Sequence, residues 1–158
     1  MRWGMKARAL SVPLLAAFVA VATAWAGEQK TTAESPAVID ISPNAPPDLA
    51  LKPVQNYPFM QIMAGDKPVY GSREDFVSKD GELRVDYSQY STISLKLLDW
   101  PADEFMYFVE GQVEITDAQG RGKVYGPGDM ILMPKGFSGT WRQLSPIRKI
   151  SVTYGWSE

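Results

Sequence analysis

The sequence predicts an all-β domain, a sandwich or barrel of antiparallel strands, preceded by an extended N-terminal arm. Two observations lead to this prediction. After Tyr57 the chain consists of short alternating or β-branched segments, each bounded by Gly, Pro, Asp or Asn. No segment after residue 26 shows a sustained helical apolar period. Short strands separated by turn residues are typical of sandwiches and barrels.

Residues 1–26 are predicted to be a secretory signal peptide that precedes the fold. Three basic residues in "MRWGMKAR" are followed by an uncharged stretch, and Ala24-Trp25-Ala26 fits a small-x-small cleavage site. We therefore expect a periplasmic or secreted protein. The alternative is an uncleaved membrane anchor, which Pro13 and the short apolar run disfavour.

Residues 27–58 are predicted to form an extended arm, because this stretch contains six prolines. Each proline fixes φ and removes a hydrogen-bond donor, which excludes a helix and a central strand. The arm is expected either to be disordered or to lie along a sheet edge of its own or a neighbouring subunit. Its apolar piece "AVIDI", residues 37–41, is a candidate edge strand.

Residues 59–158 are expected to form the β domain. Its predicted strands fall within residues 82–87, 91–98, 104–111, 112–120, 122–129, 130–136, 139–144 and 147–156. Residues 116–122 read as a hairpin loop in which Gly120 and Gly122 can adopt positive φ, and Gly111 marks a tighter reversal.

The composition excludes several classes of chemistry. The chain has no histidine and no cysteine, which excludes disulfides, thiolate nucleophiles, imidazole bases and metal sites built from nitrogen or sulfur ligands. Removal of the three basic residues of the leader from 16 leaves 13 against 18 acidic residues, a net charge of −5. This acidic balance argues against nucleic acid as a partner.

Two spacings in the chain resemble the cupin superfamily. In "EFMYFVEG" Glu104 is followed by six residues and Gly111, and "GDMILMPKG" places Gly128, Pro134 and Gly136 as in the second cupin motif. Within the cupins, "DEFMYFVEG", "GPGD", "PKGFSGTW" and "PIRK" resemble the branch of ureidoglycine aminohydrolase, a manganese enzyme. The resemblance covers roughly residues 83–154. It implies a small jelly roll, or double-stranded β-helix, with a pocket inside the barrel.

The resemblance also implies a metal site that this sequence does not reproduce. Cupin metal sites typically use three histidines and one Glu, and Glu104 matches the latter. The other matching positions are Leu98 and Trp100, or Leu97 and Asp99, for the first motif, and Gly139 for the second. We therefore expect no metal and no cofactor, and take the resemblance as evidence on fold rather than activity.

Strand alternation predicts which side chains face the pocket. If Glu104 faces inward, Met106 and Phe108 do too, whereas the intervening side chains, Tyr107 among them, face away. The candidate ligand-binding residues are Glu104, Met106, Trp100, Trp141 and Lys149, with Gly139 beside Trp141 on the same wall. The alternative for Met106, Phe108 and Trp141 is ordinary barrel core. Trp100 is either a stacking platform or a cap on the barrel end.

Glu104 is the candidate for chemistry, because a carboxylate inside an apolar barrel is costly without a partner. Either Lys149, Arg148 or Arg142 pairs with it, or it anchors a ligand's amine or hydroxyl, or it acts as a general acid or base. A hard cation shared with Asp103 and Asp99 is disfavoured, because neighbours on a strand point to opposite faces. Asp103 is expected instead to accept a hydrogen bond from loop backbone.

Three functions remain open at this stage. The favoured one is a non-enzymatic cupin that binds a small polar organic ligand in its barrel. The second is a metal-independent isomerase or lyase that uses Glu104, with Lys149 or Tyr107 as an auxiliary group. The third is a structural module that forms a homodimer, with the arm crossing to the partner.

Overall fold

A computed structural model describes residues 36–46 and 48–156 of the chain. The predicted signal peptide, residues 1–26, lies outside the described residues. The described chain forms two antiparallel sheets and contains no helix, which confirms the all-β prediction. It follows that no described segment is a helix of the length and apolarity that a membrane span requires.

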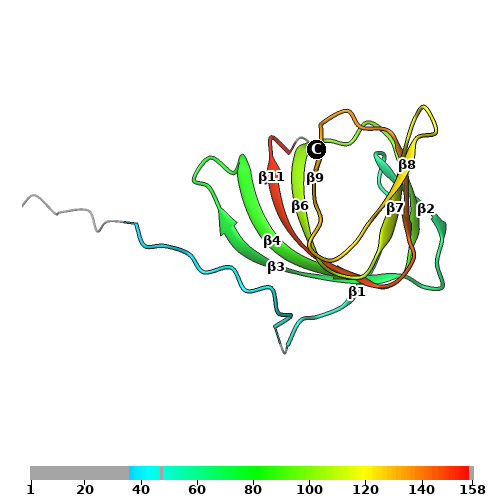
Figure 1. Ribbon diagram of the computed structural model, residues 1–158. Helices are drawn as coiled ribbons and strands as arrows, with labels where there is room; N and C mark the ends of the chain where they lie inside the picture. Colours follow the sequence, from blue (N-terminus) through cyan, green and yellow to red (C-terminus); the bar gives the residue numbers. More distant parts are fainter. Residues whose placement is uncertain (1–35, 47, 157–158) are drawn as a thin grey trace, which may run out of the picture. The chain divides into compact units, whose positions relative to one another are not determined.

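The strands of each sheet come from distant parts of the chain (Figure 1). In spatial order, the larger sheet contains β1 (Lys52–Pro53), β3 (Val69–Val77), β4 (Leu83–Tyr90), β11 (Ile147–Tyr154), β6 (Asp103–Glu110) and β9 (Met130–Met133). The smaller sheet contains β2 (Met60–Ala64), β5 (Ser94–Leu97), β10 (Gly139–Gln143), β7 (Val113–Asp117) and β8 (Gly122–Tyr125).

Each of the eight predicted segments contains a strand, and three further strands precede them. β3 was not predicted by residue range, because its alternation is broken. Gly71 lies in its first half, and its register against β4 shifts between Glu74 and Phe76. A bulge of this kind moves later side chains to the opposite face, so no single period of two runs through the strand.

A short part of the described arm lies along the edge of its own sheet. Lys52 and Pro53 pair with Tyr70 and Val69 of β3. Arg73 of β3 also contacts an earlier part of the arm: its guanidinium donates hydrogen bonds to the backbone carbonyls of Asn44 and Ser42. Residues 37–41, the candidate edge strand, are exposed and form no strand, so that assignment was wrong.

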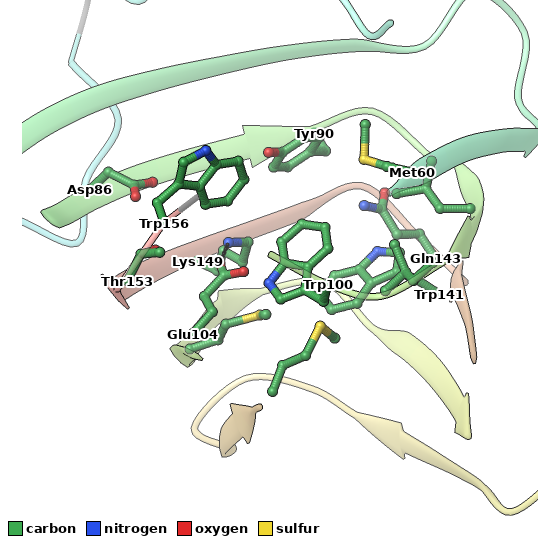
Figure 2. Close-up of a pocket in the computed structure, with 14 residues that line it drawn as sticks. Met60, Asp86, Tyr90, Trp100, Glu104, Trp141, Gln143, Lys149, Thr153 and Trp156 are labelled. Atoms are coloured by element: carbon green, nitrogen blue, oxygen red, sulfur yellow. Dashed lines mark hydrogen bonds and ion pairs between the residues drawn. The ribbon is translucent and has the colours of Figure 1, made fainter. Parts of the chain in front are cut away.

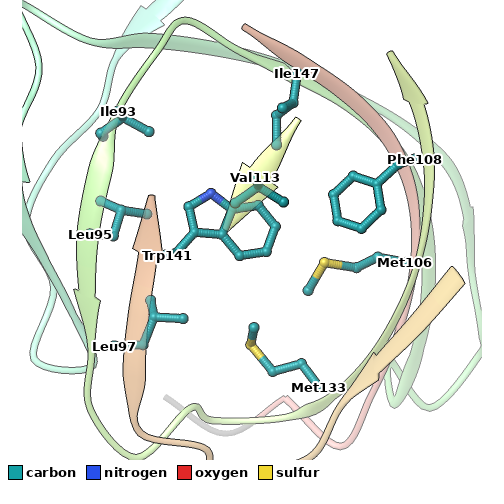
Figure 3. Packing of buried hydrophobic residues seen from close by; sticks show 9 residues of the cluster. All are labelled: Ile93, Leu95, Leu97, Met106, Phe108, Val113, Met133, Trp141 and Ile147. Carbon is teal, nitrogen blue, oxygen red and sulfur yellow. The ribbon is translucent and has the colours of Figure 1, made fainter. Parts of the chain in front are cut away.

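The core lies between the two sheets. Nine buried apolar side chains point into this interior from both sheets (Figure 3). They are Ile93, Leu95, Leu97, Met106, Phe108, Val113, Met133, Trp141 and Ile147. Burying side chains of this size contributes about 1.5–3 kcal/mol each, which makes this cluster the main apolar contribution to folding.

Two turn glycines behave differently from one another. Gly120 adopts φ 79° in the β7–β8 loop, as expected. Gly122 does not adopt positive φ; it lies in β8, where a Cβ would come within 2.9 Å of Thr116 Oγ1. Two features require glycine at position 111: its φ is 81°, and a Cβ there would lie 2.0 Å from Pro146 O. That close approach holds the β6–β7 turn against the start of β11.

Candidate functional site

A cavity of about 180 Å³ lies in the interior of the barrel (Figure 2). The smaller sheet contributes mostly apolar lining, and the larger sheet contributes most of the polar lining. The lining residues are Met60, Asp86, Tyr90, Leu95, Leu97, Trp100, Glu104, Met106, Met133, Trp141, Gln143, Lys149, Thr153 and Trp156. All five candidate ligand-binding residues from the sequence are among them.

Strand β6 presents alternate side chains to the cavity. Glu104, Met106 and Phe108 are buried, whereas Phe105 and Tyr107 are 38% and 36% exposed on the outer face. The orientation expected from alternation therefore holds along this strand. It also removes Tyr107 as an auxiliary group for chemistry at Glu104, because the two side chains point to opposite faces.

Three polar side chains of strand β11 point inward. Lys149, Ser151 and Thr153 are buried, while the intervening Ile150 and Val152 are partly exposed on the outer face. This polarity is the reverse of an ordinary amphipathic strand, in which apolar residues face the core. Burial of hydroxyl and ammonium groups costs free energy unless they are paired, so each inward group needs a partner.

Lys149 and Glu104 form a buried ion pair. Lys149 Nζ lies 2.7 Å from Glu104 Oε1, with only 8% and 7% of the two side chains exposed. Ser151 completes the network, since its hydroxyl donates to Glu104 Oε1 at 2.8 Å and accepts from Lys149 Nζ. Both hydrogen bonds to Glu104 within the described residues go to Oε1. Glu104 thus has a structural partner inside the barrel.

The pKa of Lys149 is raised by its surroundings. Burial alone would lower that pKa, but the electrostatic interaction with Glu104 and, to a smaller extent, with Tyr90 and Asp86 more than offsets the loss of hydration. Lys149 is therefore a fixed cation at neutral pH. The other two candidates for pairing with Glu104 are engaged elsewhere: Arg148 with Glu110 at 2.9 Å and Arg142 with Glu114 at 2.5 Å.

Two titratable residues of β4 also line the cavity. Asp86 is partly buried, and no described residue donates a hydrogen bond to its carboxylate. Burial raises the pKa of Asp86, and repulsion from Glu104 adds to this while attraction by Lys149 opposes it. Burial likewise raises the pKa of Tyr90 to about 12, so its phenol is neutral at neutral pH.

Aromatic rings form one end of the cavity. Trp100 and Trp156 both line it and meet at 90° with centroids 5.9 Å apart, and Phe59 packs edge-on against each indole at 5.5 Å. The indole Nε1 of Trp100 is buried and has no hydrogen-bond partner. Trp100 therefore packs against other aromatic rings, as the cap alternative describes, and its indole N–H is an unpaired donor.

Two further lining residues, Trp141 and Gln143, have their polar atoms paired within the protein. Trp141 Nε1 donates to the Gln143 amide oxygen at 3.3 Å, and the Gln143 nitrogen donates to Ser91 O at 2.8 Å, in the amide orientation that pairs both groups. Trp141 is also part of the core cluster. Its polar atom is thus already paired, and its ring supplies apolar wall.

Gly139 does not line the cavity. A Cβ at this position would lie 2.2 Å from the Thr116 carbonyl oxygen and 2.9 Å from the Phe137 ring. The glycine is present because the backbone of β7 approaches closely, so the position admits no side chain without a shift of the strand. The prediction that Gly139 lies on the cavity wall beside Trp141 was therefore wrong.

Comparisons with known proteins place this fold in a superfamily. Residues 96–150 match the family model of the EutQ-like cupin domain. These residues form a cupin domain, so the protein is a cupin-domain protein. Among solved structures, a DUF861-family protein of unknown function from Pseudomonas syringae pv. tomato is similar with a TM-score of 0.56 and 20% identity. That match covers 66% of this chain and 44% of the other.

A second solved structure, the EutQ protein of Clostridium difficile, is 22% identical with a TM-score of 0.48. The match covers 56% of this chain and 69% of the EutQ chain. A search of curated proteins finds no match to the sequence. At 20% identity the likeness to the DUF861-family protein concerns the fold alone, and function has to be argued from the site itself.

The side chains of this cupin do not fit the metal site that its superfamily implies. Glu104 is paired with an ammonium, and Asp103 accepts a hydrogen bond from Lys135 N at 2.9 Å, as the sequence led us to expect. Within residues 36–46 and 48–156, no group of three or more acidic side chains is placed so that it could hold a metal ion. The chain offers no imidazole or thiolate as a replacement.

Several lining residues of this cupin were not predicted. Asp86, Tyr90, Thr153 and Trp156 lie on β4, on β11 or just after it, and the first two share a face. The alternation of polar and apolar residues in "KISVT" of β11 shows that the polar residues share one face of the strand. The pattern did not identify Thr153 as a lining residue, because hydrophobicity alone would assign the apolar residues, and not the polar ones, to the interior.

Proposed function

We propose that this cupin is a non-enzymatic binding protein that holds a small polar organic ligand in its barrel. The observation that carries the proposal is the inner face of the larger sheet. Its three central strands turn Asp86, Lys149, Thr153 and Glu104 toward a cavity instead of filling the space with apolar side chains. Buried polar groups of this kind cost stability, and pockets that combine apolar walls with a few polar groups are typical ligand sites.

The size of the cavity fits a small ligand. An engineered cavity of about 150 Å³ in another protein accommodates benzene. The cavity here has a volume of about 180 Å³, which suits a compact molecule of that order and not a drug-sized one. The unpaired Trp100 Nε1 supports an occupant with an acceptor atom, because such an atom would supply the missing hydrogen bond.

The alternative of acid–base catalysis by Glu104 has less support. The Glu104 carboxylate is held by Lys149 and Ser151, and Tyr107 points away from the cavity. Acid–base chemistry at a carbon centre needs two groups on either side of the reacting atom. The finer resemblance, to ureidoglycine aminohydrolase, accordingly stays a statement about sequence and not a proposal of activity.

Self-association is a second candidate, carried by a separate observation. The outer face of the larger sheet exposes four large apolar side chains on its last two strands, which we call the β6–β9 face: Phe105, Tyr107, Met130 and Leu132. β9 is also an edge strand. Contiguous exposed apolar side chains next to a free edge favour association with a second copy of the chain.

Export is part of the proposal on sequence grounds alone. The layout of residues 1–26 supports a periplasmic or secreted protein whose mature chain begins at Gly27. N-terminal sequencing of protein recovered from fractionated cells would test it. A chain that keeps Met1 in the membrane fraction would contradict cleavage.

The binding proposal is tested by filling the cavity. Met133→Trp replaces a lining methionine with a bulkier indole and is expected to abolish ligand capture. Native mass spectrometry after incubation with a metabolite extract measures the capture. Met130→Trp, on the exposed face of the same strand, is the matched control and should retain capture. Met60→Trp gives a second cavity variant at a partly buried position.

The outcome that overturns the proposal is specific. If the wild type captures no small molecule, or if Met133→Trp and Met60→Trp capture the same molecule as Met130→Trp, the cavity is not a binding site. Circular dichroism of each variant shows whether it is folded before its binding is compared.

A further inference from the structure

The cavity carries an uncompensated negative charge. Three charged side chains line it, the two carboxylates Asp86 and Glu104 and the ammonium of Lys149. Glu104 and Lys149 neutralise each other at 2.7 Å. Asp86 remains without a hydrogen-bond donor among the described residues, and the lining has a net charge of −1.

The environment of Asp86 makes that charge costly in the empty protein. The carboxylate is partly removed from water, and three further carboxylates lie near it: Glu104 on β6, and Glu74 and Asp75 on β3. Lys149 on β11 is the cation that faces it, but Glu104 already holds that ammonium. The raised pKa of Asp86 is consistent with this imbalance. A ligand cation beside Asp86 would restore neutrality.

The aromatic lining is suited to the same kind of ligand. Trp100 and Trp156 stand perpendicular to each other at the end of the cavity, and Tyr90 lines it from β4 with a neutral phenol. Figure 2 shows Asp86 and Trp156 on the same side of the lining residues. Aromatic faces beside a carboxylate attract ammonium groups, and tryptophan is the strongest of the three ring types.

We propose that the ligand of this cavity is a small organic ammonium that carries a hydrogen-bond acceptor. Its cationic group lies against Asp86 and the indoles of Trp100 and Trp156. Its acceptor takes the hydrogen bond that Trp100 Nε1 does not make within the protein. This inference rests on the proposed binding function and names the chemical class of its ligand.

The inference is tested with three probes of nearly one shape and different charge. Choline is the cation, 3,3-dimethylbutan-1-ol is its neutral carbon analogue, and 3,3-dimethylbutanoate is the anion. Titration calorimetry on the full mature chain at pH 7 measures the dissociation constant of each. Choline is expected to bind about tenfold more tightly than the neutral alcohol. The anion is expected to bind more weakly than the alcohol.

Two variants assign the preference to Asp86. Asp86→Asn keeps the shape of the side chain and is expected to reduce the preference for choline over the alcohol from about tenfold to near parity. Glu74→Gln is the matched control: it removes the same charge one strand away, from an exposed position opposite Asp86 that does not line the cavity. It should retain the preference.

The outcomes separate this inference from the function on which it rests. If the alcohol or the anion binds as tightly as choline and Met133→Trp abolishes that binding, the inferred preference for a cationic ligand is wrong. The proposed binding function then stands. If none of the three binds, the inference is overturned, and ligand capture by the Met133→Trp and Met130→Trp pair decides the function separately. The wild-type comparison alone suffices if Asp86→Asn does not fold.

Discussion

At the scale of single residues, the central feature is a carboxylate that has an ammonium as its partner. Lys149 Nζ lies 2.7 Å from Glu104, the residue that the sequence resemblance matches to the metal-binding glutamate of cupins. A buried ion pair of this kind is weak evidence for stability, because desolvation of both charges offsets much of their attraction. Its removal is informative when only one partner is lost, because the other is then left charged and buried.

Glu104→Gln is expected to lower the free energy of unfolding by about 3 kcal/mol, because Lys149 keeps its charge without a counter-charge. Urea denaturation followed by tryptophan fluorescence measures this. Glu110→Gln is the control, since Glu110 pairs with Arg148 on the surface, and a loss under about 1 kcal/mol is expected there. The double change Glu104→Met and Lys149→Met should restore most of the stability while removing the polar wall.

The pH dependence of the same pair has a definite sign. The folded-state pKa of Lys149 is raised above its ordinary value of 10.5, so the pair's contribution is fully present below pH 10.5. It is lost only as the pH rises through the higher folded-state pKa. A loss of stability of the wild type relative to the double variant between pH 7 and 9 would contradict this assignment.

At the scale of strands, the wall around β10 is fixed by backbone contact and not by a ligand. Gly139 begins β10 and pairs with Leu97 of β5 and Asp117 of β7. The Thr116 carbonyl occupies the space in which a Cβ would lie. The position that the sequence resemblance matches to a cupin histidine therefore serves close packing of strands in this chain.

Gly139→Ala is expected to destabilise the protein by about 2 kcal/mol, because β10 must shift away from β7 to admit the methyl group. Gly126→Ala is the control, since the nearest atom to its Cβ would be the flexible Gln112 side chain at 3.4 Å. Thermal unfolding by calorimetry compares the two. Equal melting temperatures for both variants would show that the approach of Thr116 does not constrain this strand.

At the scale of the whole molecule, the polarity of the larger sheet is reversed on several strands. Polar side chains of β11 face the cavity, while Ile150, Val152 and the β6–β9 face are turned outward. One reversal supports two proposals at once, a polar cavity within and an apolar surface for a second copy outside. Both follow from the same registers of β4, β11 and β6.

Self-association through the β6–β9 face predicts that the mass of the wild type in solution corresponds to two chains. Leu132→Glu places a charge in the centre of that face and is expected to give a single chain, measured by light scattering during gel filtration. Val124→Glu on β8 of the smaller sheet, another exposed apolar position, is the control and should leave the mass unchanged. A one-chain mass for the wild type at every concentration would refute the interface.

Much of the candidate site was accessible from the sequence because strands alternate. Once Glu104 is placed inward, Met106 follows from the period of two, and Trp141 follows from the neighbouring motif. Asp86 and Trp156 were not accessible in this way. They reach the cavity through the pairing of β4 with β11 and through the chain that follows β11, which are contacts between distant segments.

The sequence by itself determined the all-β class, the eight strands from residue 82 onward and the absence of imidazole and thiolate chemistry, since these depend on local patterns and residue types. Only the tertiary structure decided that Lys149 pairs with Glu104, that Asp86 is left without a donor, and that Gly139 is packed against backbone. The physical reason is that local periodicity assigns side chains to faces, whereas burial and charge pairing depend on which faces the long-range registers bring together.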